Sequence, residues 1–185
     1  RDLAMNYART PILSAYEGRE PDNTIDEKSC AAIIFTSGTT GEEKGVMLSH
    51  ANLIDTTFNG NFDVNIKISI LPMHHAFSVK SDFLTPLGVG STICFHNGMD
   101  KLGEALQAYE PTCLSMVPMI ANALYNKVFM LSQQTGKTME ECKYLVFGKR
   151  INQIITGGAH LPSELVDKYQ NIGILIGQGY GMSEC

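Results

Sequence analysis

Three features that would each indicate a particular class of protein are missing from this sequence of 185 residues: an excess of positive charge, a long apolar run and closely spaced cysteines. The formal net charge is −5, so binding to nucleic acid or to an anionic membrane surface has little support. No apolar run approaches the roughly 18 residues that a membrane-spanning helix needs, and the first residues do not lead into a signal-peptide core. We therefore expect a cytoplasmic protein without a transmembrane segment.

The cysteines are scattered and odd in number, and no two of them form a Cys-x-x-Cys pair. Reduced thiols are the simplest interpretation, with neither a zinc site nor a disulfide framework. The last cysteine, Cys185, ends the sequence inside what reads as a motif, and the first residue is not Met. We expect a piece of a longer protein, with enough apolar composition (44%) to bury a substantial core.

Apolar runs and helical periodicities alternate along the chain, without an internal repeat. This alternation predicts an α/β fold with a mostly parallel sheet flanked by helices, after a leading segment and linker at 1–29. The predicted strands are 30–35, 46–48, 66–71, 91–95, 112–117, 151–156 and 172–176. The predicted helices are a helix capped by Ser49 and others at 82–89, 100–109, 119–131 and 162–170, with a polar insertion at 133–143 and a further helix within 1–17.

The most informative stretch runs from Ile33 to Leu48. An apolar run at 30–35, of the kind expected for a strand buried on both faces, ends in six small residues and is followed by Lys44. Their hydroxyls can donate hydrogen bonds, the glycines admit close approach of backbone N–H groups, and the lysine supplies charge, so the loop suits a phosphate. The six residues are Thr36, Ser37, Gly38, Thr39, Thr40 and Gly41.

Two other interpretations of this stretch are a flexible surface loop and the nucleotide loop of the P-loop enzymes. The second is excluded, because Glu43 stands where its second glycine must be and Gly45 stands where Ser or Thr should hold magnesium. The stretch instead resembles the phosphate-binding signature of the adenylate-forming superfamily, which includes acyl-CoA synthetases, luciferases and the adenylation domains of peptide synthetases. Glu43 is a departure, since the superfamily usually has proline or a small aliphatic residue there.

A second segment, from Gln178 to Glu184, combines glycines with an aromatic ring, a hydroxyl and a carboxylate. These groups suit a nucleobase, a phosphate oxygen and Mg²⁺ in turn. The segment is similar to a second signature of the superfamily, and the resemblance implies that Tyr180 stacks on adenine, that Ser183 binds the α-phosphate, and that Glu184 with Thr36 holds Mg²⁺. The nucleotide-binding residues predicted here are Gln178, Gly179, Tyr180, Gly181, Met182 and Ser183.

Two further segments follow predicted strands. Pro72 to Phe77 resembles the superfamily segment that places a histidine beside the acyl pocket, and His75 is the better match; a locally satisfied histidine pair and a metal site are the alternatives. Residues 157–160 resemble a turn that lies against adenine, which adds Gly158, Ala159 and His160 to the nucleotide site, with His160 where proline is common. Phe77, Phe83 and Leu84 are candidates for an acyl channel.

Parallel strands would bring several of these segments to one edge of the sheet. The resemblance implies a ligase that uses ATP and Mg²⁺ to convert a carboxylic acid, a fatty acid in first place, into an acyl-adenylate (with AMP released later) and then into a coenzyme A thioester. Lys44, His75 and Glu184 are the predicted catalytic residues. Residues 30–185 would be part of the large AMP-binding domain, without the small carboxy-terminal domain. Alternatives are adenylation of an aryl or amino acid and a non-catalytic nucleotide-binding or scaffold module.

Overall fold

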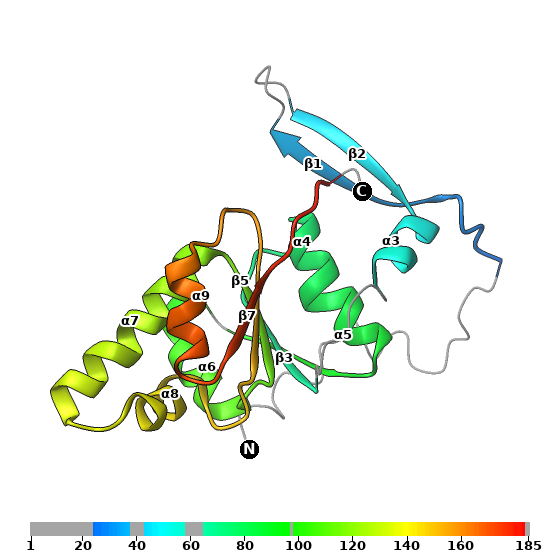
Figure 1. Ribbon diagram of the computed structural model, residues 1–185. Coiled ribbons are helices and arrows are strands. Elements are labelled where there is room, and N and C mark those ends of the chain that lie inside the picture. Colours follow the sequence, from blue (N-terminus) through cyan, green and yellow to red (C-terminus); the bar gives the residue numbers. More distant parts are fainter. Residues whose placement is uncertain (1–23, 38–42, 58–64, 97, 184–185) are drawn as a thin grey trace.

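A five-stranded parallel sheet forms the centre of the molecule (Figure 1). The computed structural model describes residues 24–37, 43–57, 65–96 and 98–183. Along the sheet the strand order is β4-β3-β5-β6-β7, and every neighbouring pair is parallel. This confirms the predicted α/β class. The strands are β3 (Ile66–Ser69), β4 (Thr92–Phe95), β5 (Cys113–Met116), β6 (Gln153–Thr156) and β7 (Leu175–Gln178).

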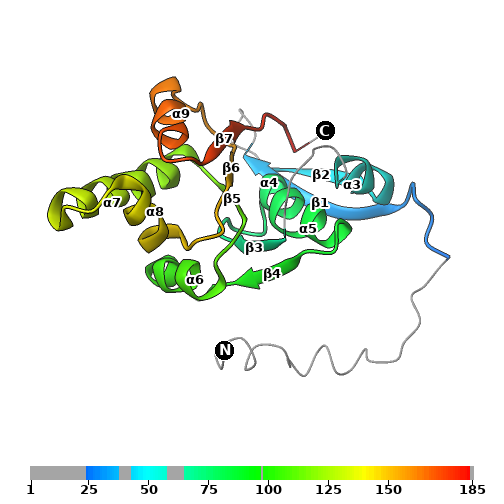
Figure 2. The ribbon, with the colours of Figure 1, turned by 60° about the horizontal axis from the view of Figure 1, so that its bottom comes forward.

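Helices cover both faces of this sheet, as Figure 2 shows. Four helices pack on one face: α6 (Leu102–Tyr109), α7 (Pro118–Thr135), α8 (Met139–Phe147) and α9 (Ser163–Gln170). A continuous helical run lies on the other: α4 (Ala76–Ser78), the π-helix η1 (Val79–Leu84) and α5 (Thr85–Gly88). A 3₁₀ turn, η2 (Met99–Lys101), precedes α6. None of the helices in the described ranges is long and apolar enough to cross a bilayer.

The two faces of the sheet differ in chemistry. The register aligns Ile68, Leu114 and Ile154 in one row, and all three are fully buried in the hydrophobic core beneath α6 to α9. The adjacent row on the opposite face carries Lys67 and Cys113, with Ser115 two residues further along β5. Successive side chains of a strand point to opposite faces, so a polar face lies beneath α4, η1 and α5.

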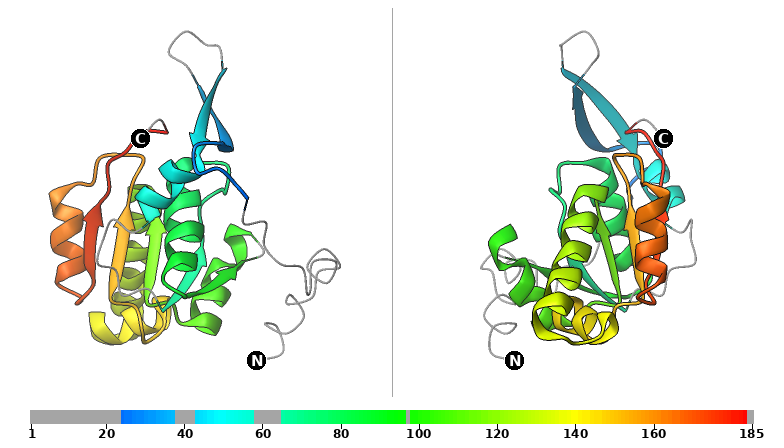
Figure 3. Two further views of the ribbon diagram at one scale, coloured as in Figure 1. Left: turned by 90° about the vertical axis from the view of Figure 1, so that its right-hand side faces the viewer. Right: turned by 60° about the vertical axis from the view of Figure 1, so that its left-hand side comes forward.

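A separate antiparallel hairpin stands at the end of the sheet where the parallel strands finish (Figure 3). It consists of β1 (Cys30–Ser37) and β2 (Glu43–Ser49) and leads into α3 (His50–Thr57). The predicted strand at 30–35 exists, but the prediction that it is buried on both faces is wrong. Ile33 and Phe35 are 55% and 66% exposed while Ile34 between them is buried, because a hairpin strand pairs outside the central sheet and presents one face outward.

Local signals explain the helix boundaries. The expected cap at Ser49 is confirmed, since its Oγ accepts the Asn52 N–H at 3.2 Å. The polar insertion predicted at 133–143 is wrong: α7 extends to Thr135 and α8 begins at Met139, after a capping box in which Thr138 and Glu141 satisfy each other's backbone N–H groups. The helix predicted within 1–17 lies outside the described residues.

Candidate functional site

A pocket of about 950 Å³ lies over the carboxyl ends of the parallel strands. Its walls come from α3, from the α4–η1–α5 run, from the turn after β6 and from the segment after β7, and β3 contributes to its floor. Three of the four segments predicted to meet at one edge therefore line one cavity, as the parallel topology requires. The predicted residues among its lining are His75, Phe77, Leu84, Gly157, Gly158, Gly179, Tyr180, Gly181, Met182 and Ser183.

The segment after β3 forms the first wall. His75 occupies the N-cap position of α4 with extended backbone angles (φ −96°, ψ 138°), and its ring lies 4.3 Å from that of His74, between centroids. The Ser78 hydroxyl donates to the Leu71 carbonyl at 3.0 Å, which ties the start of the helix to the strand end. Of the predicted acyl-channel residues, Phe83 does not line the pocket.

The turn after β6 forms the second wall. A Cβ atom built on Gly157 would lie 3.0 Å from two ring carbons of Phe77, so a side chain would fit there only if the ring moved by a few tenths of an ångström. Gly158 has φ +76°, a conformation that other residues adopt only with strain. Ala159 and His160 are exposed and do not line the pocket.

Gly157→Ala should therefore displace the Phe77 ring, which lines the pocket, by a few tenths of an ångström. For the acid-activating reaction that the sequence leads us to expect, kcat/KM for the acid should fall about tenfold in the full-length protein, as for a misplaced methyl group in an apolar site, with a smaller effect on the KM for ATP. Gly177→Ala is the matched control, because a Cβ there meets nothing within 4 Å. Phe77→Leu should restore activity to Gly157→Ala; equal activity of both glycine variants would contradict the proposed contact.

The segment after β7 forms the third wall. It continues from the sheet, since the Gly179 N–H donates to the Thr156 carbonyl at 2.7 Å. The Gln178 side chain does not line the pocket: its Oε1 accepts the Leu161 N–H at 3.0 Å and holds the turn after β6 against β7. Tyr180 is 89% exposed although it lines the pocket, so its ring is accessible for stacking.

The predicted phosphate loop follows a strand of the antiparallel hairpin, whereas the other three segments follow strands of the parallel sheet. Thr36, the first residue of this loop, and Lys44, three residues beyond its last, are cross-strand partners in the hairpin, and the Thr36 hydroxyl lies 3.5 Å from the Lys44 carbonyl. Neither residue lines the pocket. Ser37 ends β1, whereas Gly38, Thr39, Thr40 and Gly41 lie outside the described residues.

The residues that could hold Mg²⁺ are only partly within the described chain. Thr36 offers a hydroxyl oxygen, a ligand type that suits a hard cation, and its partner in the prediction, Glu184, lies outside the described residues. Within those residues no group of three His, Cys, Asp or Glu side chains converges, so the alternative of a metal site built on His74 and His75 gains no support there.

A buried ion pair beneath the pocket was not predicted from the sequence. Lys67 on β3 and Asp82 on η1 are both fully buried, with Nζ and Oδ1 3.6 Å apart, and Nζ donates to the Ser115 hydroxyl at 2.6 Å. Asp82 also accepts the Ile70 and Leu71 N–H groups at 3.3 and 3.5 Å. Burial raises the pKa of Asp82 above its ordinary value, and the Lys67 charge opposes that rise. The pair fixes η1 to the strand that leads into His75.

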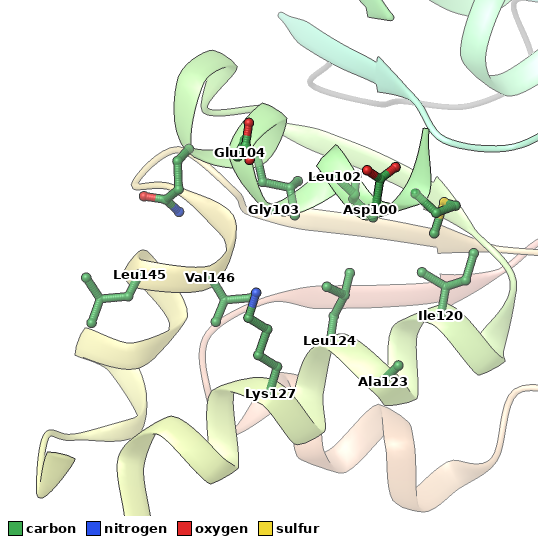
Figure 4. A pocket seen from close by; sticks show the side chains of 13 residues that line it. Asp100, Leu102, Gly103, Glu104, Ile120, Ala123, Leu124, Lys127, Leu145 and Val146 are labelled. Atoms are coloured by element: carbon green, nitrogen blue, oxygen red, sulfur yellow. The ribbon is translucent and has the colours of Figure 1, made fainter. Parts of the chain in front are cut away.

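A second hollow, of about 700 Å³, lies on the other side of the sheet between α6, α7 and α8 (Figure 4). Leu124 and Ile120 line its apolar part, and Lys127 reaches toward Gly103 of α6. It contains none of the predicted site residues. The pocket at the carboxyl ends of the strands is therefore the candidate functional site.

Comparisons with known proteins agree on one family. The model of the family described as "AMP-binding enzyme" matches residues 4–185. A 4-coumarate--CoA ligase-like protein of Arabidopsis thaliana is 32% identical over 169 residues, which is 86% of this chain and 28% of that protein. The peroxisomal long chain acyl-CoA synthetase 6 of the same organism is 32% identical over 138 residues, 71% of this chain and 20% of its own length.

Solved structures confirm the fold. The adenylation domain of a carboxylate reductase from Mycobacterium chelonae superimposes with a TM-score of 0.73 at 22% identity, over 92% of this chain and 29% of that one. The A-PCP didomain of a carboxylic acid reductase from Segniliparus rugosus, solved with AMP, gives 0.72 at 23% identity, over 88% of this chain and 25% of that one. The chain thus spans less than a third of the length of each of these relatives.

Proposed function

Because the chain belongs to the AMP-binding enzyme family, we propose that the full-length protein activates a carboxylic acid with ATP and transfers the acyl group to coenzyme A. The observation that carries this proposal is the convergence of three segments, 72–77, 157–158 and 179–183, on one pocket at the carboxyl ends of the strands. Relatives with ligase or synthetase names match across most of this chain, which supports an acid–thiol ligase.

Two half-reactions follow from this proposal. A carboxylate oxygen of the acid attacks the α-phosphorus of ATP, and pyrophosphate leaves; the thiol of coenzyme A then attacks the acyl carbon, AMP leaves and the thiol proton is released. Both steps develop negative charge on oxygen, which Lys44, the loop hydroxyls and backbone N–H groups are suited to stabilise. Mg²⁺, when bound by Glu184 and Thr36, would supply further positive charge at the phosphates. Tyr180 provides an exposed ring for the adenine.

The acid is proposed to occupy the pocket between α3 and the α4–η1–α5 run. Its apolar lining by Leu53, Phe77 and Leu84 suits a fatty acid, which is our first candidate. An aryl acid is the second, because 4-coumarate--CoA ligases and a ligase-like relative match 86–94% of this chain at 30–32% identity. His75 would orient the acid at the mouth of this pocket. A non-catalytic scaffold is a less favoured alternative, since the predicted binding residues are all present in the sequence.

Purified full-length protein incubated with ATP, Mg²⁺, coenzyme A and a panel of fatty, aryl and amino acids tests the proposal. We expect release of pyrophosphate that depends on the acid, followed by formation of the coenzyme A thioester. Inactivity with every acid would support the scaffold alternative, and a product that stops at the acyl-adenylate would remove coenzyme A from the reaction. Cell fractionation would test the proposed cytoplasmic location.

A further inference from the structure

A lysine in the acid pocket lacks a counter-ion. Lys80, on η1, lines the pocket and is half-buried. The ion pairs found among the described residues do not include it, so no carboxylate in that part of the chain lies within 4 Å of its ammonium. A cation in such surroundings is costly unless an anion joins it. The pocket therefore has a place for an anionic group.

The neighbouring charges do not supply this anion. Asp82 lies two residues further along η1, which places it on roughly the opposite side of a helical turn, and it already pairs with Lys67 beneath the pocket. Asp55 on α3 also lines the pocket, but it is exposed and forms none of the ion pairs found among the described residues. Among the residues that the structure describes, Lys80 thus has no carboxylate partner on the pocket wall.

Lys80 lies on the π-helical turn of η1, beside Val79 and Ser81, which also line the pocket. The turn is closed by the Thr85 N–H, which donates to the Lys80 carbonyl. Because π-helical turns are rare and are found frequently at functional sites, the location of Lys80 favours a role in binding.

The position of Lys80 along the run indicates which end of the substrate it meets. The reacting carboxylate must approach the nucleotide, which we place beside His75 and Gly179. Lys80 lies five residues beyond His75, about 7.5 Å along a helix axis, so a carboxylate that it binds would be at the end of the acid remote from the reacting one. Resting on the proposed function, we infer that the preferred substrate is a dicarboxylic acid, whose second carboxylate pairs with the Lys80 ammonium.

Matched acids test this inference in the full-length protein. Pyrophosphate release is measured with hexanedioic against hexanoic acid, octanedioic against octanoic acid and decanedioic against decanoic acid. We expect at least one diacid to have the higher kcat/KM. Lys80→Met should lower that value about tenfold or more while leaving the monoacids unchanged, because only the diacid loses a charge-assisted contact. Lys80→Arg should retain the preference, and Lys127→Met, in the hollow on the other side of the sheet, should change neither acid.

Other outcomes overturn the inference. Equal losses for both acids in Lys80→Met would mean that Lys80 binds the reacting carboxylate, and a raised KM for ATP or coenzyme A alone would mean that it binds a phosphate. A wild-type preference for monoacids that Lys80→Met leaves unchanged would overturn the inference while the proposed function stands. Inactivity with every acid would overturn the proposed function itself.

Discussion

Lys67→Met should destabilise the full-length protein by about 3–5 kcal/mol near neutral pH, because it leaves the Asp82 carboxylate buried without its counter-ion. The free-energy cost of protonating Asp82 sets an independent upper limit on this loss of stability, because the carboxyl can become neutral instead of remaining as an unpaired charge. Protonating a carboxyl of ordinary pKa 3.8 at pH 7 costs about 4 kcal/mol, at 1.36 kcal/mol per pH unit. The cost of the unpaired charge and the cost of protonation are therefore of similar size. Chemical denaturation of the wild type and of Lys67→Met measures the loss of unfolding free energy.

The pH dependence of this loss has a definite sign. Burial raises the pKa of Asp82, so the folded state holds this proton more tightly than the unfolded state does. The stability that this group contributes is therefore complete below its unfolded pKa and is lost as the pH rises through the folded value. Removing Lys67 raises the folded pKa further, so the difference between Lys67→Met and the wild type should shrink as the pH falls from about 7 toward 4.

Two variants separate the charge from the packing. Lys67→Met combined with Asp82→Asn leaves no unpaired charge and keeps an oxygen for the Ile70 N–H, so it should be more stable than Lys67→Met alone. Lys127→Met, which alters an exposed lysine, should change stability by no more than about 0.5 kcal/mol. A loss in Lys67→Met that is independent of pH, and equal in the double variant, would show that the ion pair does not determine the effect.

The elements around this ion pair show how much of the fold the sequence predicts. Strands and helices of the parallel sheet are predictable because apolar runs alternate with helical periodicity, and the parallel order then brings the ends of β3, β6 and β7 together. The pairing of β1 cannot be predicted in this way. A short apolar run fits a central strand and a hairpin strand equally well, and only the tertiary structure decides between these two positions. The α8 helix has a local signal in Thr138 and Glu141, spaced as a capping box.

The pocket floor was less accessible to prediction than its rim. Glycines, hydroxyls and aromatics after strands indicate a nucleotide site by their chemistry, whereas Lys67 within the apolar run of β3 indicates only that a charge must find a partner. That partner, Asp82, is distant in sequence, and no local motif marks the π-helical turn of η1 that carries it. Lys80 was missed for the same reason, because it lies on that turn.

Lys44→Ala should lower the rate of adenylation by about a hundredfold in the full-length protein, the loss typical of removing one donor that stabilises developing charge. Lys44 follows the predicted phosphate loop at the end of the hairpin where this loop joins β1 to β2, opposite Thr36, and its side chain is exposed. None of the ion pairs among the described residues engages it, so the charge is free to meet a phosphate.

Pyrophosphate release at saturating acid and varied ATP measures this effect. Lys44→Arg keeps the charge and should retain more activity than Lys44→Ala, while Lys28→Ala, an exposed lysine before β1, is the matched control. Glu184→Gln should impair the same step by weakening Mg²⁺ binding, and extra Mg²⁺ should rescue Glu184→Gln but not Lys44→Ala, because only the first acts through the metal. Near wild-type rates in both Lys44→Ala and Glu184→Gln would place the ATP phosphates away from the hairpin loop and leave the pocket at the sheet edge as a binding site of another kind.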